Sequence, residues 1–245
     1  MSIWGKVIGG TAGFALGGPI GAIIGVMVGG RLTKKQGSFF SKNKITNEQK
    51  QNIFALSVII LSAKIAKADG KVTKDEIAAF KEKFKIPNSE MNQVGKIFNE
   101  AKKNTFGYKK IADQIGDLFS DNRILLEELL NNLFYIAESD GNISVNEIDL
   151  LKSISESFHL PESDFERIFH TRLKNKKSDP YKILDVNRDD VDSVIRKKWI
   201  MLNKQHHPDN LIAKGMPQEF IDQANEELSS INLAYDKIKE FRGIS

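Results

Sequence analysis

Residues 7–30, VIGGTAGFALGGPIGAIIGVMVGG, contain no charged side chain. As a helix, these 24 residues would be about 36 Å long, enough to cross a bilayer core of about 30 Å. Glycine recurs at every fourth position, at Gly5, Gly9, Gly13, Gly17, Gly21, Gly25 and Gly29. In water each glycine costs a helix about 1 kcal/mol relative to alanine, whereas in lipid only a helix satisfies the backbone of a single span. The segment therefore predicts a membrane anchor over residues 1–30.

The glycine spacing and the flanking charges predict how this anchor is arranged. The glycines share one side of the helix, which allows a second helix to approach closely, so we expect a homodimer. Lys6 precedes the apolar segment, and five basic residues follow it: Arg31, Lys34, Lys35, Lys42 and Lys44. The positive-inside rule then predicts a single span in the cell inner membrane, with the N-terminus outside and the rest of the chain in the cytoplasm. A helical hairpin bent at residues 17–19 stays open. A cleaved signal peptide is disfavoured, because a single lysine precedes the apolar segment and no convincing small-x-small cleavage site is present.

Composition excludes several function classes. The chain has no cysteine, so it has no disulfide, no zinc–thiolate site and no catalytic thiol. Its net charge of +4 is concentrated in residues 1–44, which hold six basic residues and no acid. The basic pI therefore reflects a patch beside the apolar segment and a basic linker over residues 31–47. We expect no nucleic-acid binding, because that function needs a basic face on a folded module.

Residues 48–173 show helical periodicity throughout and no convincing alternation of period two, so we expect an all-α domain without a sheet. The predicted helices cover residues 48–68, 73–84, 89–103, 108–119, 122–139, 144–158 and 162–172. Pro87 and Pro161 lie where two of these helices should begin.

This region contains an internal repeat: AKADGKVTKDEI at residues 66–77 matches AESDGNISVNEI at residues 137–148. Each copy places Asp-Gly at a helix end and then a capping box, Thr73 with Glu76 and Ser144 with Glu147. Metal binding is the alternative interpretation, through Asp69, Glu76, Asp140 and Glu147, because each glycine precedes its glutamate by six positions, as in an EF-hand. An intact EF-hand is excluded, because the positions two and four before each aspartate are not paired oxygen ligands.

The paired motif resembles the TerB-like domain of tellurite-resistance proteins over residues 48–173. The resemblance implies an all-helical bundle with an acidic surface, and metal association in some members.

Two amphipathic helices are predicted near the C-terminus, after a polar linker at residues 174–179. Residues 190–206 carry an apolar stripe, namely Val191, Val194, Ile195, Trp199 and Leu202. Residues 217–241 carry a second one, namely Phe220, Ala224, Leu228, Ile231, Tyr235 and Ile238. Pro208 ends the first helix, so we expect a loop over residues 207–216 at one end of an antiparallel hairpin.

The residues His206-His207-Pro208-Asp209 lie at or just after the end of the first helix. Adjacent histidines on a helix point about 100° apart, which does not suit zinc, and no nucleophile accompanies His207 and Asp209. We therefore expect no enzymatic activity and no cofactor.

The segments DPYKILDV, IRKKW and HPD in this helical frame resemble a J domain, the module of DnaJ-type co-chaperones, over residues 180–245. Together with the glycine-rich anchor and the TerB-like region, the whole chain is similar to the DjlA type of membrane-anchored co-chaperone. The resemblance implies that His207, Pro208 and Asp209 stimulate the ATPase of a DnaK-type chaperone, directed at membrane or envelope-stress clients. A metal-responsive TerB-like adaptor that recruits the chaperone is the alternative.

The first helix of the hairpin is expected to present Arg196, Lys197 and Lys204 to the chaperone. Ile200 and Met201 stand where the family usually has a basic pair. We expect slower, less electrostatically steered association, or packing of these two side chains against the TerB-like region.

Overall fold

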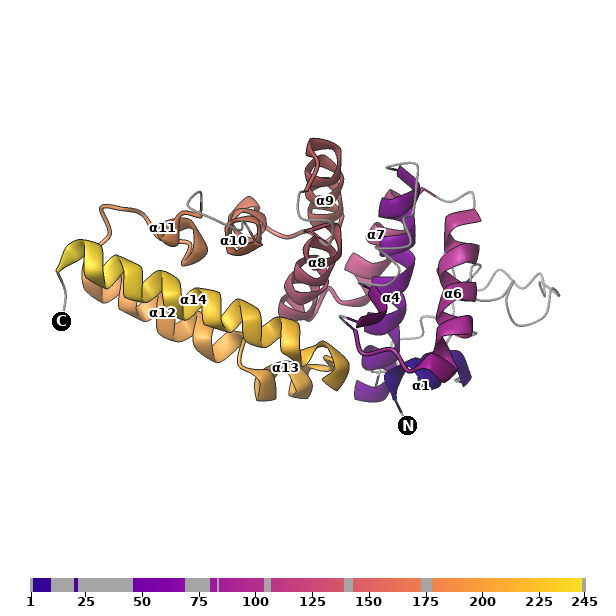
Figure 1. Cartoon of the computed structure of the whole chain (residues 1–245). Coiled ribbons are helices and arrows are strands. Elements are labelled where there is room, and N and C mark those ends of the chain that lie inside the picture. The colour runs from indigo at the N-terminus through magenta and orange to yellow at the C-terminus, as the bar shows by residue number, and fades with distance from the viewer. Residues whose placement is uncertain are drawn as a thin grey trace.

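The computed structural model describes residues 2–9, 20–21, 46–68, 80–82, 84–103, 107–138, 143–172 and 178–243. The described residues form helices and turns and contain no strand, which confirms the all-α prediction. Helices α4 to α10 form a bundle, and α11 to α14 form an arm that extends from it (Figure 1).

The bundle is built around α4 (Asn47–Ala68), which packs against α6 (Asn88–Lys103), α7 (Tyr108–Leu118) and α8 (Arg123–Ala137). Residues 52–65 of α4 are buried on every side, because apolar residues predominate around the whole helix and the few polar ones are buried with them. Ser57 and Ser62 are buried there, and each hydroxyl donates to the carbonyl oxygen four residues earlier, over 2.7 and 2.6 Å. Helices α9 (Val145–Ser157) and α10 (Glu162–Arg172) complete the bundle against α7 and α8.

The arm consists mainly of α12 (Asp192–Gln205) and α14 (Ile221–Arg242), which lie side by side in Figure 1. They share a small apolar core with α11 (Pro180–Ile183), in which the rings of Trp199 and Tyr235 stack with centroids 4.4 Å apart. Val191 and Val194 of the predicted stripe are exposed, because Val191 precedes α12 and Val194 lies one position off the buried stripe.

The segment between these two helices differs from the predicted loop. It contains α13 (Pro208–Lys214) and the one-turn helix η2 (Gln218–Phe220). Pro208 ends α12 as expected, but it also starts α13, because proline is compatible with the first position of a helix. Gly215 then ends α13 in the left-handed conformation, with φ of 107°.

The end of the arm that carries α13 also contributes to the apolar core of the bundle. Five arm residues are buried in the core of the bundle, namely Leu211, Met216, Phe220, Ile221 and Ala224. Phe220 is fully buried, with its ring centroid 5.1 Å from that of Phe54 and 4.9 Å from that of Phe84. The half of the arm that carries α13 is therefore fixed in the core of the bundle, and the other half is connected to the bundle through α11, which packs against α10 (Figure 1).

The described parts of the N-terminal segment lie against the bundle. Trp4 of α1 (Ile3–Gly9) is buried beside Phe84 and Phe220, and the backbone N–H of Ile20 donates to Oε1 of Gln114 over 3.0 Å. None of the helices in the described ranges is both long enough and apolar enough to cross a membrane. Most of the single span predicted over residues 7–30 lies outside the described residues. Of the glycine stripe, only Gly5, Gly9 and Gly21 fall within them.

The helix predicted over residues 217–241 begins later than expected, because α14 starts at Ile221, after the turn of η2. The other predicted helices agree with the structure to within two residues at each end, apart from residues 73–84. Of that range only residues 80–82 and 84 are described, and 80–82 are helical. The second copy of the repeat forms the predicted capping box: the backbone N–H of Glu147 donates to Oγ of Ser144 over 3.2 Å, and the backbone N–H of Ser144 donates to Oε2 of Glu147 over 2.8 Å. The first copy, with Thr73 and Glu76, lies outside the described residues.

Candidate functional site

The short helix α13 begins at His207-Pro208-Asp209. His207 is its N-cap, with the backbone N–H of Asp209 donating to Nδ1 of His207 over 3.2 Å. The side chains of His207 and Asp209 are 55% and 90% exposed, and Nδ1 of His207 lies 3.8 Å from Oδ2 of Asp209. The backbone of the tripeptide is therefore fixed by the start of a helix, while its carboxylate stays in solvent.

A basic face of α12 accompanies this tripeptide. Arg196, Lys197 and Lys204 are all exposed, and their spacing places them on one side of the helix. Ile200 and Met201 lie on the same side and are 50% and 41% exposed, so the expectation that they pack against the bundle is wrong. The face can offer three cations to an acidic partner, with an apolar patch between them.

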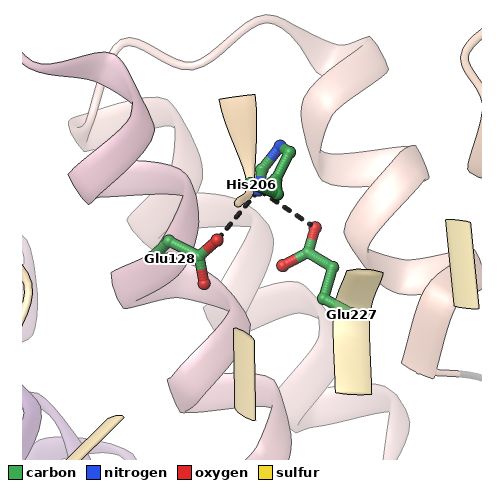
Figure 2. Close-up of side chains that lie close together, drawn as sticks. All are labelled: Glu128, His206 and Glu227. Atoms are coloured by element: carbon green, nitrogen blue, oxygen red, sulfur yellow. Dashed lines mark hydrogen bonds and ion pairs between the residues drawn. The ribbon is translucent and has the colours of Figure 1, made fainter. Parts of the chain in front are cut away.

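The four metal-ligand candidates of the repeat are not brought together in the described residues. Glu147 is engaged in its capping box, and Asp69, Glu76 and Asp140 lie outside the part of the chain that the structure describes. Within the described residues, the one group with metal-compatible spacing lies elsewhere, at Glu128, His206 and Glu227 (Figure 2).

These three side chains are completely buried between the bundle and the arm. Nδ1 of His206 lies 2.8 Å from Oε1 of Glu128 on α8 and 3.8 Å from Oε1 of Glu227 on α14. In Figure 2 both carboxylates point toward the same edge of the imidazole, from two different helices. On its other edge, Nε2 of His206 lies 3.6 Å from Oε2 of Glu127.

Two arginines of α10 complete this cluster. Arg167 is buried and pairs with two carboxylates, Glu227 through Nη1 and Glu127 through Nη2, the latter over 2.6 Å. Arg172 donates through Nε to Oδ1 of Asn131 over 2.6 Å, and the amide of Asn131 donates in turn to Oε2 of Glu227 over 2.6 Å. Glu227 is therefore already engaged by protein donors, which argues for an ion-pair cluster and against a metal centre.

The charges of the cluster depend on one another. Burial opposes the protonated form of His206, but the attraction of Glu227 and the bond to Glu128 outweigh it and raise the pKa of His206. Burial raises the pKa of Glu128, and repulsion from Glu227 adds to this effect. Burial also works against the ionised form of Glu227, yet His206 and Arg167 outweigh it and lower the pKa of Glu227. The shifts of His206 and Glu227 favour an imidazolium beside an ionised Glu227, whereas the carboxyl of Glu128 loses its proton less readily than usual.

The sequence contained a signal for this cluster that the stripe over residues 190–206 missed. Ile195, Trp199, Leu202 and His206 are spaced by four, three and four residues, so His206 continues the buried face of α12. His207, one position further, points into solvent. The two imidazoles therefore lie in different surroundings, one buried and one exposed.

Two family models match the chain. Residues 55–170 match the model described as tellurite resistance protein TerB. Residues 1–38 match the model described as the co-chaperone DjlA transmembrane domain. The two matches fall on the bundle and on the N-terminal segment, in the order predicted.

Curated relatives match over the full length. A protein named co-chaperone protein DjlA from Photobacterium profundum is 26% identical over 275 residues, covering 98% of this chain and 99% of the relative. The protein of the same name from Coxiella burnetii is 28% identical over 270 residues, covering both chains completely. A third, from Legionella pneumophila, is 26% identical over 98% of this chain and 96% of the relative. No solved structure matches the chain.

Proposed function

Because the chain belongs to the DjlA family of co-chaperones, with a TerB-like bundle and a membrane-associated N-terminal domain, we propose that it stimulates ATP hydrolysis by a DnaK-type chaperone through His207, Pro208 and Asp209. The observation that carries this proposal is the exposed Asp209 carboxylate on a backbone fixed at the start of α13. The groups that hydrolyse ATP belong to the chaperone.

The chemistry of this tripeptide suits a protein partner. An exposed carboxylate can accept charge-assisted hydrogen bonds from an arginine of the chaperone. Pro208 removes backbone freedom that binding would otherwise have to restrict, so the tripeptide is preorganised. The exposed carboxylate and the restricted backbone together allow a short tripeptide to contribute strongly to a transient contact with the chaperone.

The basic face of α12 supports the same partner by attracting an acidic surface. Arg196, Lys197 and Lys204 are exposed beside the tripeptide and increase the rate of encounter with an acidic protein. Ile200 and Met201 dilute this charge, so association depends less on salt than it would with two further basic residues. Their exposed apolar surface provides contact area in the complex.

The activity is tested by the steady-state ATPase rate of a DnaK-type chaperone with the full chain in phospholipid nanodiscs. We expect Asp209→Asn to abolish stimulation with unchanged circular dichroism, because the substitution removes an exposed charge and leaves the fold intact. Asp236→Asn is the matched control, because Asp236 is an exposed aspartate on α14, and it should stimulate like the wild type. Stimulation by Asp209→Asn at the wild-type level would contradict the proposed function.

The N-terminal segment supports a location of the chain at a membrane. The match of residues 1–38 to a transmembrane domain and the basic residues that follow the apolar segment favour a single span in the inner membrane, with the bundle and arm in the cytoplasm. The contacts of Trp4 with the bundle then belong to the chain outside a bilayer, where packing on Phe84 and Phe220 removes the Trp4 ring from water.

This topology can be tested with single cysteines, because the chain has none of its own. In intact spheroplasts, a membrane-impermeant maleimide should label Ser2→Cys, while Ser245→Cys should react only after lysis. Reaction of both sites only after lysis would support the membrane hairpin.

Self-association through the anchor is the remaining part of the proposal. The seven glycines, Gly5 to Gly29, give a smooth side on which a second copy can pack closely. Cross-linking in membranes should show a dimer that Gly17→Leu abolishes and Ala15→Leu leaves intact, because Ala15 lies off the glycine side.

A further inference from the structure

His206 connects the tripeptide to the bundle. It is completely buried and directly precedes His207, whose side chain is exposed. The imidazole of His206 points away from solvent and toward Glu128 of α8, 2.8 Å away (Figure 2). The residue that contacts the bundle, His206, is therefore the direct neighbour in sequence of His207, the first residue proposed to contact the chaperone.

Charged groups face His206 from each of the three helices packed around it. They are Glu127 and Glu128 from α8, Arg167 from α10 and Glu227 from α14. Arg167 pairs with Glu127 and Glu227. In the part of the chain that the structure describes, Glu128 makes an ion pair with His206 and with no other residue. A buried carboxylate without a cation is costly, so Glu128 holds His206 against the bundle.

The other end of α13 is also attached to the bundle. The side-chain amide of Asn122 donates to the carbonyl oxygen of Lys214 over 2.8 Å. Leu211, in the middle of α13, is fully buried in the core of the bundle. The helix that begins with the tripeptide is therefore fixed at its start, middle and end by residues of the TerB-like bundle.

We propose that Glu128 and His206 are positioning residues of this co-chaperone: their ion pair fixes α13 on the TerB-like bundle and so sets where His207, Pro208 and Asp209 are presented. The TerB-like bundle acts directly on the J domain, as the surface that orients its loop. This inference rests on the proposed function. A released α13 still carries the tripeptide, but the chaperone must then order it on binding, which weakens the complex without changing the maximal rate.

The ion pair of Glu128 and His206 also makes the docking of α13 on the bundle depend on pH. The pKa of His206 is raised in the folded chain. The positive charge of His206 therefore contributes fully to the stability of the docked α13 at pH values below the ordinary histidine pKa. That contribution is lost as the pH rises through the raised value. Docking of α13 therefore weakens on the alkaline side, by deprotonation of a group that the chaperone does not touch.

The test compares variants of the full chain in nanodiscs by two measurements, hydrogen exchange of the α13 amides and chaperone ATPase against co-chaperone concentration. We expect Glu128→Gln and His206→Asn to accelerate exchange in α13. Each should also raise the half-saturating concentration by about tenfold, the effect of one charge-assisted hydrogen bond, with the maximal rate kept. The wild type should show the same two changes as the pH is raised.

Two matched controls use exposed residues of the bundle, Glu156→Gln and His159→Asn, and both should behave like the wild type. The double variant Glu128→Gln/His206→Gln can form a neutral amide–amide hydrogen bond. It should recover slow exchange in α13 and lose the alkaline dependence, which separates positioning from general damage to the fold.

Three results would overturn the inference. One is unchanged exchange of α13 in Glu128→Gln and His206→Asn, and another is faster exchange with an unchanged half-saturating concentration. The third is a rise in melting temperature on adding Zn²⁺ that His206→Asn removes, because the cluster would then be a metal site. If the wild type fails to stimulate the chaperone at all, the proposed function fails, while the exchange data still show whether the ion pair holds α13.

Discussion

Replacing Phe220 by alanine tests whether the bundle and the arm fold as one unit. Phe220 belongs to the arm by sequence, yet its ring is fully buried in the bundle core. Its centroid lies 5.1 Å from that of Phe54, 4.9 Å from that of Phe84 and 5.6 Å from that of Trp4. Removing the ring leaves a cavity lined by these aromatic side chains, at the junction of α4, the arm and the N-terminal segment.

The expected loss is large relative to the stability of a domain. Phenylalanine-to-alanine changes in close-packed cores cost about 3 to 5 kcal/mol. Whole domains are stable by about 5 to 15 kcal/mol, so Phe220→Ala should remove a substantial part of the free energy of unfolding. For a chain of this size the corresponding fall in melting temperature is about 6 to 20 °C.

The assay is urea and thermal unfolding of the full chain in mild detergent, followed by far-ultraviolet circular dichroism and by tryptophan fluorescence. Phe241→Ala is the matched control, because Phe241 lies on α14 and is 66% exposed. It should change the free energy of unfolding by no more than about 0.5 kcal/mol. Both probes should report one transition in Phe220→Ala, shifted to lower urea and lower temperature.

Two outcomes would refute the reasoning. If Phe220→Ala loses no more stability than Phe241→Ala, the ring does not contribute to a shared core. If the arm unfolds in a separate transition while the bundle keeps the wild-type midpoint, the two parts have separate cores and the shared burial has no energetic role.

Two further predictions concern the bundle. Gly116→Ala should destabilise the chain by about 1 to 3 kcal/mol in urea unfolding, because the added Cβ would collide with the backbone carbonyl oxygen of Ser157; Gly95→Ala, which meets no atom within 4 Å, should instead stabilise by up to about 1 kcal/mol. Ser144→Ala should lower the free energy of unfolding by about 1 kcal/mol, because it removes the capping box with Glu147. The loss should be the same with and without millimolar calcium. A loss that appears only with calcium would favour the metal-binding interpretation.

The sequence contained enough local information to predict most helices. Periodicity and capping residues act over a few positions, so the limits of α6, α9, α10 and α12 could be predicted to within two residues. The same local reasoning missed α13, because Pro208 was interpreted only as the end of one helix and not as the first residue of another.

The functional site was likewise predictable from the sequence only in part. The exposure of Asp209 and of the basic residues on α12 followed from helix phase and from the proline that ends the helix. The surroundings of His206 did not, because its partner Glu128 is 78 positions away and belongs to another helix. Helix phase can predict that His206 faces inward, but it cannot predict which buried group it meets.

The sequence by itself determined an all-helical chain with an uncharged glycine-rich segment, a duplicated helical motif and an exposed His207-Pro208-Asp209, because these depend on side-chain pattern and backbone preference over short distances. Only the tertiary structure decided that Phe220 lies in the core of the bundle and that His206 is held by Glu128 and Glu227. Those contacts join residues distant in the sequence, and they form because burying an aromatic ring and a charged cluster requires partners that only the packed helices bring together.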